Sequence, residues 1–295
     1  MTVILTTGVF LKISDGFPQR FGSQMTLKLS QQISSELSPP QFQNEECLQS
    51  FPNTKSTDYR WWFCRTNSQQ PPSMLLWGNS FANQYFEGFA DNESLKHLSI
   101  VSIGDCAIQR EFDLDSGNPC AGELWDEQRD FIEKLIMNTP SLKYVIVAGL
   151  EETLSESSAT DLKRTLNFLT NWNLQPIVFY PHLKPDKPIF ACLDRPMFKA
   201  SWDCTESSKL RDDLNIAFSS TLALISKEFP STLIFDPNEA FCDSMKCEFM
   251  RGGLPLLRDK EPHMSLAGSQ LVAEEFQEWA GNHFGLMWNE KATSA

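Results

Sequence analysis

The sequence contains no run of basic residues with aromatic residues between them, and its acidic residues outnumber the basic ones by 38 to 25. The resulting net charge of −13 repels phosphate backbones and anionic lipid headgroups. Nucleic acid is therefore not expected as a partner. The acidity itself indicates no more than a solvated surface.

No apolar run reaches the roughly 20 residues that a membrane-spanning helix needs. The run at the amino terminus, from Val3 to Leu11, is broken by two threonines and a glycine, and it lacks the basic start and the small-residue cleavage site of a signal peptide. Two interpretations stay open. The run is either an ordinary docking segment or the last part of a membrane helix whose earlier residues are missing from this chain.

No two cysteines have the C-x-x-C spacing of a zinc or redox site. The eight cysteines instead form four successive close pairs: Cys47 and Cys64, Cys106 and Cys120, Cys192 and Cys204, Cys242 and Cys247. Their number alone permits roughly 100 pairings, and the sequential one is the simplest, with each bridge closing a short loop. Disulfides persist in oxidising compartments such as a periplasm or a secretory lumen. The alternative is a cytosolic protein with reduced, buried cysteines.

At 295 residues with 41% hydrophobic content, the chain is long enough for one large domain or two small ones. One compact domain with an arm is the simplest interpretation. Residues 20–73 are rich in Ser, Gln, Pro and Asn and show little periodicity before the aromatic cluster at 59–64. That composition is typical of an arm or linker that packs at its end.

Beyond the arm, short apolar runs alternate with amphipathic stretches, and such runs are typical of strands buried on both faces. They occur at 74–77, 98–103, 144–149, 176–180 and 232–236. Helical periodicity is clear over 123–137 and 161–172, and a last helix is predicted from about Ser265, its cap, to Trp279. The alternation predicts an α/β fold with a parallel sheet between helices, whose functional groups collect at the carboxyl ends of the strands.

Ser80 follows the first predicted strand, in the stretch PPSMLLWGNSFANQYFEGF. Gly78 permits a tight turn, Asn79 can bond to the local backbone, and a helix beginning near Phe81 directs its amide groups at the serine. An alkoxide or oxyanion formed there would be stabilised, which suits a nucleophile. The alternative is that Ser80 merely caps the helix, since Gly-Asn-Ser is also ordinary turn chemistry.

A serine nucleophile needs a base, and His263 lies in a polar loop between the final strand and the last helix. In a parallel sheet that loop can return to the edge where the first strand ends. Asp259 and Glu261 lie close by, so a carboxylate could orient the imidazole, as in a Ser-His-Asp triad. The alternative is an exposed histidine in a charged loop. The other histidines are interpreted as structural or surface residues: His97, His182 and His283.

These segments carry a resemblance to a known family. LLWGNSFANQYFEGF resembles the nucleophile block of the SGNH (GDSL-like) hydrolases, with Asn79 and Phe81 where the commoner motif reads Gly-Asp-Ser-His. LLRDKEPHMSLAGSQLVAEEF is similar to their carboxy-terminal Asp/His block. More narrowly, ECLQSF, WWFCR, FCDSMKCEF, the apolar start and SDGFPQRF resemble the extracytoplasmic SGNH domain appended to acyltransferase-3 membrane proteins. The resemblance covers about residues 45 to 285.

The resemblance implies a flavodoxin-like three-layer sandwich around a mostly parallel, five-stranded sheet. It divides the chain into a truncated membrane-helix remnant and periplasmic linker over 1–45, an SGNH domain over 46–290 and a tail over 291–295. It also implies a periplasmic or other extracytoplasmic location, with a tether to a membrane domain that this chain lacks.

The resemblance implies a reaction as well. In that family an acyl group, usually acetyl, is delivered across the membrane by the acyltransferase-3 domain and passed by the serine to a hydroxyl of a cell-surface glycan. Carried onto this sequence, Ser80 attacks the acyl carbonyl, and His263 accepts its proton and later activates the sugar hydroxyl. The amides of Ser80 and Gly104 hold the oxyanion. Neither a metal nor an organic cofactor is implied.

The sequence departs from the family pattern in three places. After the third strand, VIVAGLEET offers Gly149 and Glu151 where an oxyanion-hole asparagine is usual, so the hole uses backbone amides only or is damaged. Asn79 replaces the motif aspartate, a change that local hydrogen bonding tolerates. The Asp-x-x-His spacing is also absent.

Asp259 precedes His263 by four residues and is the favoured orienting acid, because an irregular turn can absorb the extra residue. Glu261 is the alternative acid, with a longer side chain that could reach back to Nδ1. In a third interpretation both carboxylates are solvated and a backbone carbonyl orients the imidazole.

Two other functions compete with acyl transfer. A secreted esterase would use the same residues to release acyl groups to water, and a non-catalytic module would bind glycan without a reactive serine. An α/β-hydrolase is not expected, because Ala82 leaves the Gly-x-Ser-x-Gly elbow incomplete. Four tryptophans could stack on sugars, although aromatic residues at this density are more typical of a core: Trp61, Trp62, Trp77 and Trp202.

Overall fold

The computed structural model describes residues 42–54, 62–110, 118–193 and 200–284. Four subjects of the sequence analysis lie outside these ranges: the apolar run Val3 to Leu11, the segment SDGFPQRF, Trp61 and the tail over 291–295. Within the described part of the chain, no helix is both long enough and apolar enough to cross a membrane.

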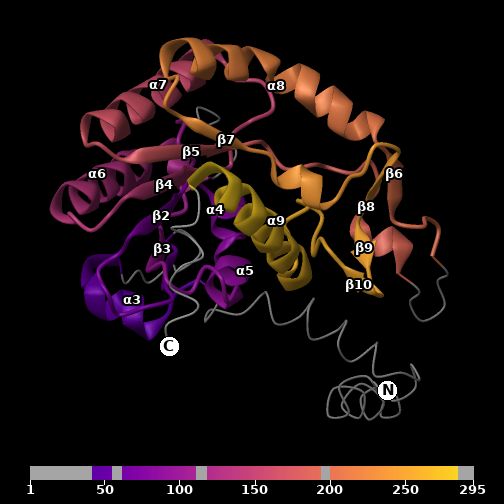
Figure 1. Cartoon of the computed structure of the whole chain (residues 1–295), viewed down its shortest axis with the longest axis horizontal. Helices are drawn as coiled ribbons and strands as arrows, with labels where there is room; N and C mark the ends of the chain where they lie inside the picture. The colour runs from indigo at the N-terminus through magenta and orange to yellow at the C-terminus, as the bar shows by residue number, and fades with distance from the viewer. Residues whose placement is uncertain (1–41, 55–61, 111–117, 194–199, 285–295) are drawn as a thin grey trace, which may run out of the picture.

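A mixed sheet of six strands forms the centre of the molecule (Figure 1). In spatial order the strands are β1 (Cys64–Thr66), β3 (Ile100–Ile103), β2 (Met74–Trp77), β4 (Tyr144–Val147), β5 (Gln175–Phe179) and β7 (Leu233–Phe235). The last five are parallel and coincide with the five predicted apolar runs, and their order is the flavodoxin-like one. The α/β class and this topology are therefore confirmed.

The sheet has one strand more than predicted. β1 pairs antiparallel with β3 at the sheet edge, with Cys64 opposite Ile103. It contains only three residues, and two of them are polar. A strand this short has no apolar run of its own, so periodicity could not reveal it.

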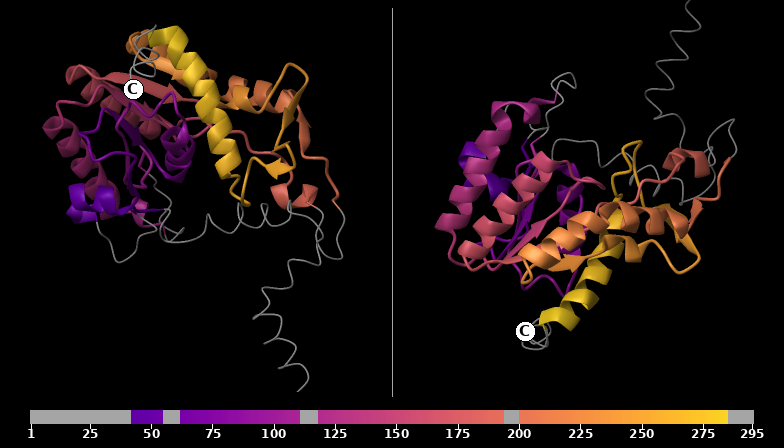
Figure 2. Two further views of the ribbon diagram at one scale, coloured as in Figure 1. Left: turned by 60° about the horizontal axis from the view of Figure 1, so that its bottom comes forward. Right: turned by 90° about the horizontal axis from the view of Figure 1, so that it is seen from above.

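Helices cover both faces of the sheet (Figure 2). One face packs against α6 (Glu123–Asn138), α7 (Glu156–Asn171) and α8 (Lys209–Glu228), and the other against α5 (Phe86–Asp91) and α9 (Leu266–Phe284). Alternate residues of each strand enter opposite layers: Leu75 faces the first group of helices, and Leu76 faces the second. Because both faces are covered, the five parallel strands consist mostly of apolar residues.

Shorter elements complete the described chain. Two are helices, α3 (Glu45–Ser50) and α4 (Ser80–Asn83). Two are small antiparallel pairs, β6 (Thr205–Ser207) with β8 (Lys246–Glu248) and β9 (Met250–Arg251) with β10 (Leu254–Pro255). The others are the 3-10 turns Pro52–Thr54, Pro119–Ala121, Ile189–Cys192 and Pro237–Ala240. α4 directly follows β2, at the point where the strand order reverses between β3 and β4. In sheets of this kind ligands bind at that crevice.

All eight cysteines are paired, and the sequential pairing is confirmed. The disulfides join Cys47 to Cys64, Cys106 to Cys120, Cys192 to Cys204 and Cys242 to Cys247. The paired cysteines are 17, 14, 12 and 5 positions apart in the sequence. Such bridges stabilise a fold by limiting the conformations open to the unfolded chain. Four disulfides fit an oxidising compartment.

Candidate active site

Ser80 is the first residue of α4, and Asn79 is the cap of that helix. The Asn79 side chain accepts the Phe81 N–H at 3.0 Å. The interpretation of Ser80 as the cap is therefore wrong, because the neighbouring asparagine already satisfies the helix. The serine hydroxyl is left for another partner.

Two glycines set the position of the turn that carries Ser80. A Cβ at Gly78 would lie 2.1 Å from the Ala148 carbonyl oxygen, and one at Gly149 would lie 2.0 Å from Asn79 Oδ1. Both glycines also have positive φ, 156° and 75°. Only glycine fits such close contacts, so the end of β4 packs directly against the turn after β2. The Asn79 amide fixes this arrangement by donating to the Gly149 carbonyl at 3.3 Å.

The fold brings Ser80 and His263 together across 183 positions of the sequence. Ser80 Oγ lies 2.8 Å from His263 Nε2. On the other side of the ring, His263 Nδ1 lies 2.8 Å from Asp259 Oδ2, and the His263 N–H donates to Asp259 Oδ1 at 3.0 Å. A proton on Nδ1 leaves Nε2 free to accept from the serine. The three side chains thus have the arrangement of a Ser-His-Asp triad.

The structure places Asp259, and not Glu261, beside the imidazole. Glu261 is exposed and makes no hydrogen bond within the described part of the chain. The loop is closed by the Arg258 N–H, which donates to the His263 carbonyl at 2.9 Å. This tight, non-helical turn accommodates the additional residue between acid and base.

The nucleophile helix also fixes the loop that carries the histidine. Gln84, the residue after α4, accepts the Met264 N–H at 2.7 Å through its side-chain oxygen. Gln84 and Met264 are both buried. A buried hydrogen bond between neighbours of the serine and of the histidine limits relative movement of the two groups.

Asp259 is held as a carboxylate. Burial by itself would raise the pKa of Asp259, but its hydrogen bonds to His263 and the positive charges of His263 and Arg258 lower that pKa below its ordinary value. The group therefore stays ionised and can stabilise an imidazolium at His263.

The predicted oxyanion donor at Gly104 is wrong. Its N–H donates to the Phe63 carbonyl oxygen at 2.9 Å, where β3 continues its pairing with the edge strand. The next two amides, those of Asp105 and Cys106, both donate to Gln128 Oε1 at 2.7 and 2.9 Å. The Ser80 N–H, the other predicted donor, has no hydrogen bond among the described residues and stays a candidate.

Sequence reasoning missed the part played by Asn83. This buried side chain donates to the Asn79 carbonyl at 3.0 Å and to the Gly104 carbonyl at 3.1 Å. It thereby ties α4 to the loop after β3. The amphipathic pattern offered no signal for it, because a buried asparagine at a helix end looks the same in sequence as an exposed one.

The remaining candidates are the tryptophans and the three other histidines. Of the tryptophans that might stack on sugars, Trp62 and Trp77 are buried, and Trp202 is partly buried with its indole N–H on the Thr205 carbonyl at 2.7 Å. His97 and His283 are exposed. His182 is buried, with only 6% of its surface exposed, and its Nε2 has no hydrogen-bond partner in the described ranges.

Burial of His182 predicts a loss of stability in acid. Burial, together with the positive charges of Lys184 and His263, lowers the pKa of His182 to about 3. The unfolded chain binds this proton near pH 6.5 and the folded chain does not, so the free energy of unfolding falls as the pH drops from about 6.5 to about 3. Relative to His182→Phe, wild type should lose about 2 kcal/mol between about pH 7 and about pH 5.

Urea unfolding of both proteins at the two pH values measures this difference. His97→Phe is the matched control, because the His97 side chain is exposed, unlike that of His182. An equal response of wild type and His182→Phe would mean that His182 takes up its proton in the folded state.

Comparison with known proteins identifies the family and the fold. The family model described as an SGNH domain fused to AT3 domains matches residues 46–278. Comparison with curated proteins gives no match. Among solved structures, the chain is similar to the periplasmic domain of a lipopolysaccharide acetyltransferase from Salmonella ser. Paratyphi A, with 12% identity, a TM-score of 0.51 and coverage of 74% of this chain and 85% of that chain. At this identity the similarity shows a shared fold.

Proposed function

The chain belongs to the family of SGNH domains fused to AT3 domains, and from this membership we propose that it is an extracytoplasmic O-acyltransferase. It passes an acyl group, acetyl in the simplest case, through Ser80 to a hydroxyl of a cell-surface polysaccharide. The acyl donor is delivered by a membrane acyltransferase-3 domain to which this chain is tethered. The observation that carries the proposal is the 2.8 Å contact between Ser80 Oγ and the Nε2 atom of an aspartate-paired histidine.

The first half-reaction acylates the serine. Ser80 Oγ attacks the acyl carbonyl carbon while its proton moves to His263 Nε2. The bond between the carbonyl carbon and the donor atom then breaks, and the leaving group takes the proton from the imidazolium. The product is an ester on Ser80. Asp259 stabilises the imidazolium that exists between these steps.

The second half-reaction transfers the acyl group. A sugar hydroxyl gives its proton to His263 Nε2 and attacks the ester carbonyl, and the Ser80 oxygen leaves with that proton. The Ser80 N–H, at the amino end of α4, is the candidate donor to the oxyanion in both halves. No step in this sequence requires a metal or an organic cofactor.

Hydrolysis competes with transfer at the same site. If water replaces the sugar hydroxyl, the identical residues give an esterase. A non-catalytic glycan-binding module would not require the alignment of Asp259, His263 and Ser80, so the triad geometry favours an enzyme.

Mass spectrometry of the intact protein with an aryl acetate tests the proposal. We expect an acetyl adduct on the peptide that contains Ser80, and transfer of this acetyl group to an added polysaccharide in preference to water. Ser80→Ala should form neither the adduct nor the product. Rapid hydrolysis with no transfer to any polysaccharide tested would identify an esterase, and a protein that forms no adduct at Ser80 and releases no product would contradict both functions.

A further inference from the structure

Phe81, the residue after Ser80, lies in a stack of three aromatic rings. Its ring centroid is 3.9 Å from that of His182 and 4.3 Å from that of His263, with interplanar angles of 19° and 13°. Two imidazoles so close and so nearly parallel would collide on one face of a phenyl ring, so they lie on opposite faces. We propose that Phe81 and His182 are positioning residues that hold the His263 imidazole in line with Ser80, an inference that rests on the proposed function of this site.

Phe81 is the ring that contacts His263, and its chemistry suits a neighbour of the catalytic base. A phenyl face offers no hydrogen-bonding group, so it does not draw either nitrogen of His263 away from Ser80 or Asp259. The face of an aromatic ring also attracts a cation. Phe81 can therefore cover the imidazole in its neutral form and stabilise the imidazolium that forms during acyl transfer.

His182 packs on the face of the Phe81 ring opposite to the one that His263 contacts. Its side chain is almost entirely buried and Nε2 has no partner among the described residues, so a positive charge on this ring is disfavoured. The ring therefore packs as a neutral aromatic. It adds no second positive charge near His263 when that residue accepts a proton.

One buried side chain fixes the backbone on both sides of His182. The Asn238 amide nitrogen donates to the Pro181 carbonyl at 2.9 Å, and the amide oxygen accepts the Leu183 N–H at 3.0 Å. Asn238 has no exposed surface. His182 cannot withdraw from Phe81 without breaking these buried hydrogen bonds.

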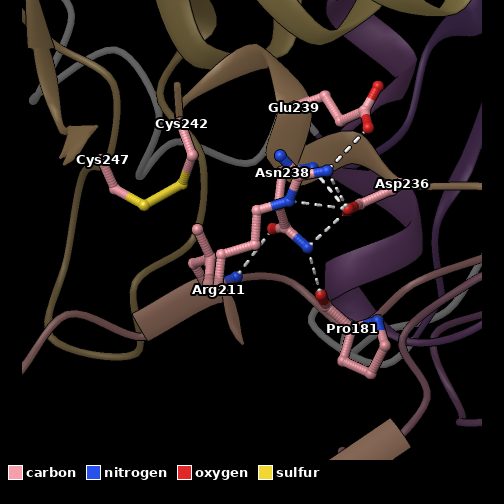
Figure 3. Close-up of polar contacts among 8 residues, drawn as sticks. Pro181, Arg211, Asp236, Asn238, Glu239, Cys242 and Cys247 are labelled. Carbon is pink, nitrogen blue, oxygen red and sulfur yellow. Dashed lines mark hydrogen bonds and ion pairs between the residues drawn. A yellow bond between two sulfur atoms is a disulfide. The ribbon is translucent and has the colours of Figure 1, made fainter. Parts of the chain in front are cut away.

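Asn238 is itself held by an ion-pair network (Figure 3). Asp236 Oδ1 accepts from the side-chain and backbone nitrogens of Asn238 at 2.8 and 2.9 Å. Arg211, on α8, donates to Asp236 Oδ2 at 3.1 Å and to Glu239 Oε1 at 2.6 Å. The loops after β5 and β7 are thus joined by buried hydrogen bonds, and together they hold His182 against Phe81.

Steady-state kinetics of the full chain with an aryl acetate test the proposal. His182→Ala and Phe81→Leu should lower kcat by about tenfold or more, because a small misplacement of a catalytic group is costly, and should leave KM within about twofold. His182→Phe and Phe81→Tyr keep a ring in the stack and should restore most of the lost kcat. Because His182 acts through Phe81, the double variant Phe81→Leu/His182→Ala should be no slower than Phe81→Leu alone.

Phe276→Leu is the matched control for general packing. Phe276 is a buried aromatic residue on α9 that contacts Phe89 and Phe179 but not the stack. This variant should lower the unfolding temperature and keep kcat. Unchanged kcat in His182→Ala, independent effects in the double variant, or an equal loss of kcat in Phe276→Leu would each overturn the proposal.

Nuclear magnetic resonance provides a readout that does not depend on activity. The chain has only four histidines, so the imidazole nitrogens of each can be assigned. His263 should give one sharp set of signals with the proton on Nδ1, and Phe81→Leu should broaden or split that set. Unaltered His263 signals in Phe81→Leu would refute the positioning role. A wild-type protein without turnover, or an active Ser80→Ala variant, would refute the proposed function instead.

Discussion

Replacing Ser80 with alanine should reduce hydrolysis of an aryl acetate by about four orders of magnitude or more. The hydroxyl is the group that forms the acyl-enzyme, and no other nucleophile lies at the same hydrogen-bond distance from His263 Nε2 within the described part of the chain. Binding groups and the oxyanion donor would remain, so a small residual rate is expected. Initial rates at saturating substrate, with enzyme purified free of host esterases, measure the loss.

Ser80→Ala should leave stability unchanged, because the Ser80 side chain makes its one hydrogen bond to His263. Ser155→Ala is the matched control. The Ser155 hydroxyl caps α7 by accepting the Ser158 N–H at 3.1 Å, so its loss should cost about 1 kcal/mol of stability and leave turnover intact. If Ser80→Ala kept full turnover, the nucleophile assignment would be wrong.

Asp259→Asn should lower kcat by about four orders of magnitude, whereas Glu261→Gln should stay near wild type. Asp259 accepts from the imidazole Nδ1 at 2.8 Å and thereby keeps the proton on that nitrogen. The asparagine amide can instead donate to Nδ1, which moves the ring proton to Nε2. His263 would then present a donor to Ser80 and could no longer accept its proton.

Kinetics of both variants, with circular dichroism to confirm folding, distinguish the two carboxylates. Glu261→Gln is an exact chemical counterpart of Asp259→Asn in the same loop, and it changes the local charge by the same amount. A large loss in Glu261→Gln with a nearly normal Asp259→Asn would transfer the orienting role to the glutamate. Equal, modest losses in both would indicate that a backbone group orients the imidazole.

Local patterns in the sequence determined the class of fold and the disulfides. The five parallel strands are apolar because both faces of the sheet are covered, and a run of this kind is visible without knowledge of its neighbours. The sequential disulfides were also predictable, since bridges between cysteines 5 to 17 positions apart close short loops. Ser80 could be placed at the end of the first strand because that strand is one of these visible apolar runs.

Contacts between distant segments were decided only by the tertiary structure. The edge strand β1 is too short to be seen in the sequence, yet its neighbour Phe63 takes up the Gly104 amide that was predicted to hold the oxyanion. The 2.9 Å hydrogen bond from the Arg258 N–H to the His263 carbonyl closes a turn that places Asp259, and not Glu261, beside the imidazole. His182 joins the site because Asn238, on another loop, holds it there. Hydrogen bonds and ring contacts of this kind depend on distances in space, and no periodicity along the chain encodes them.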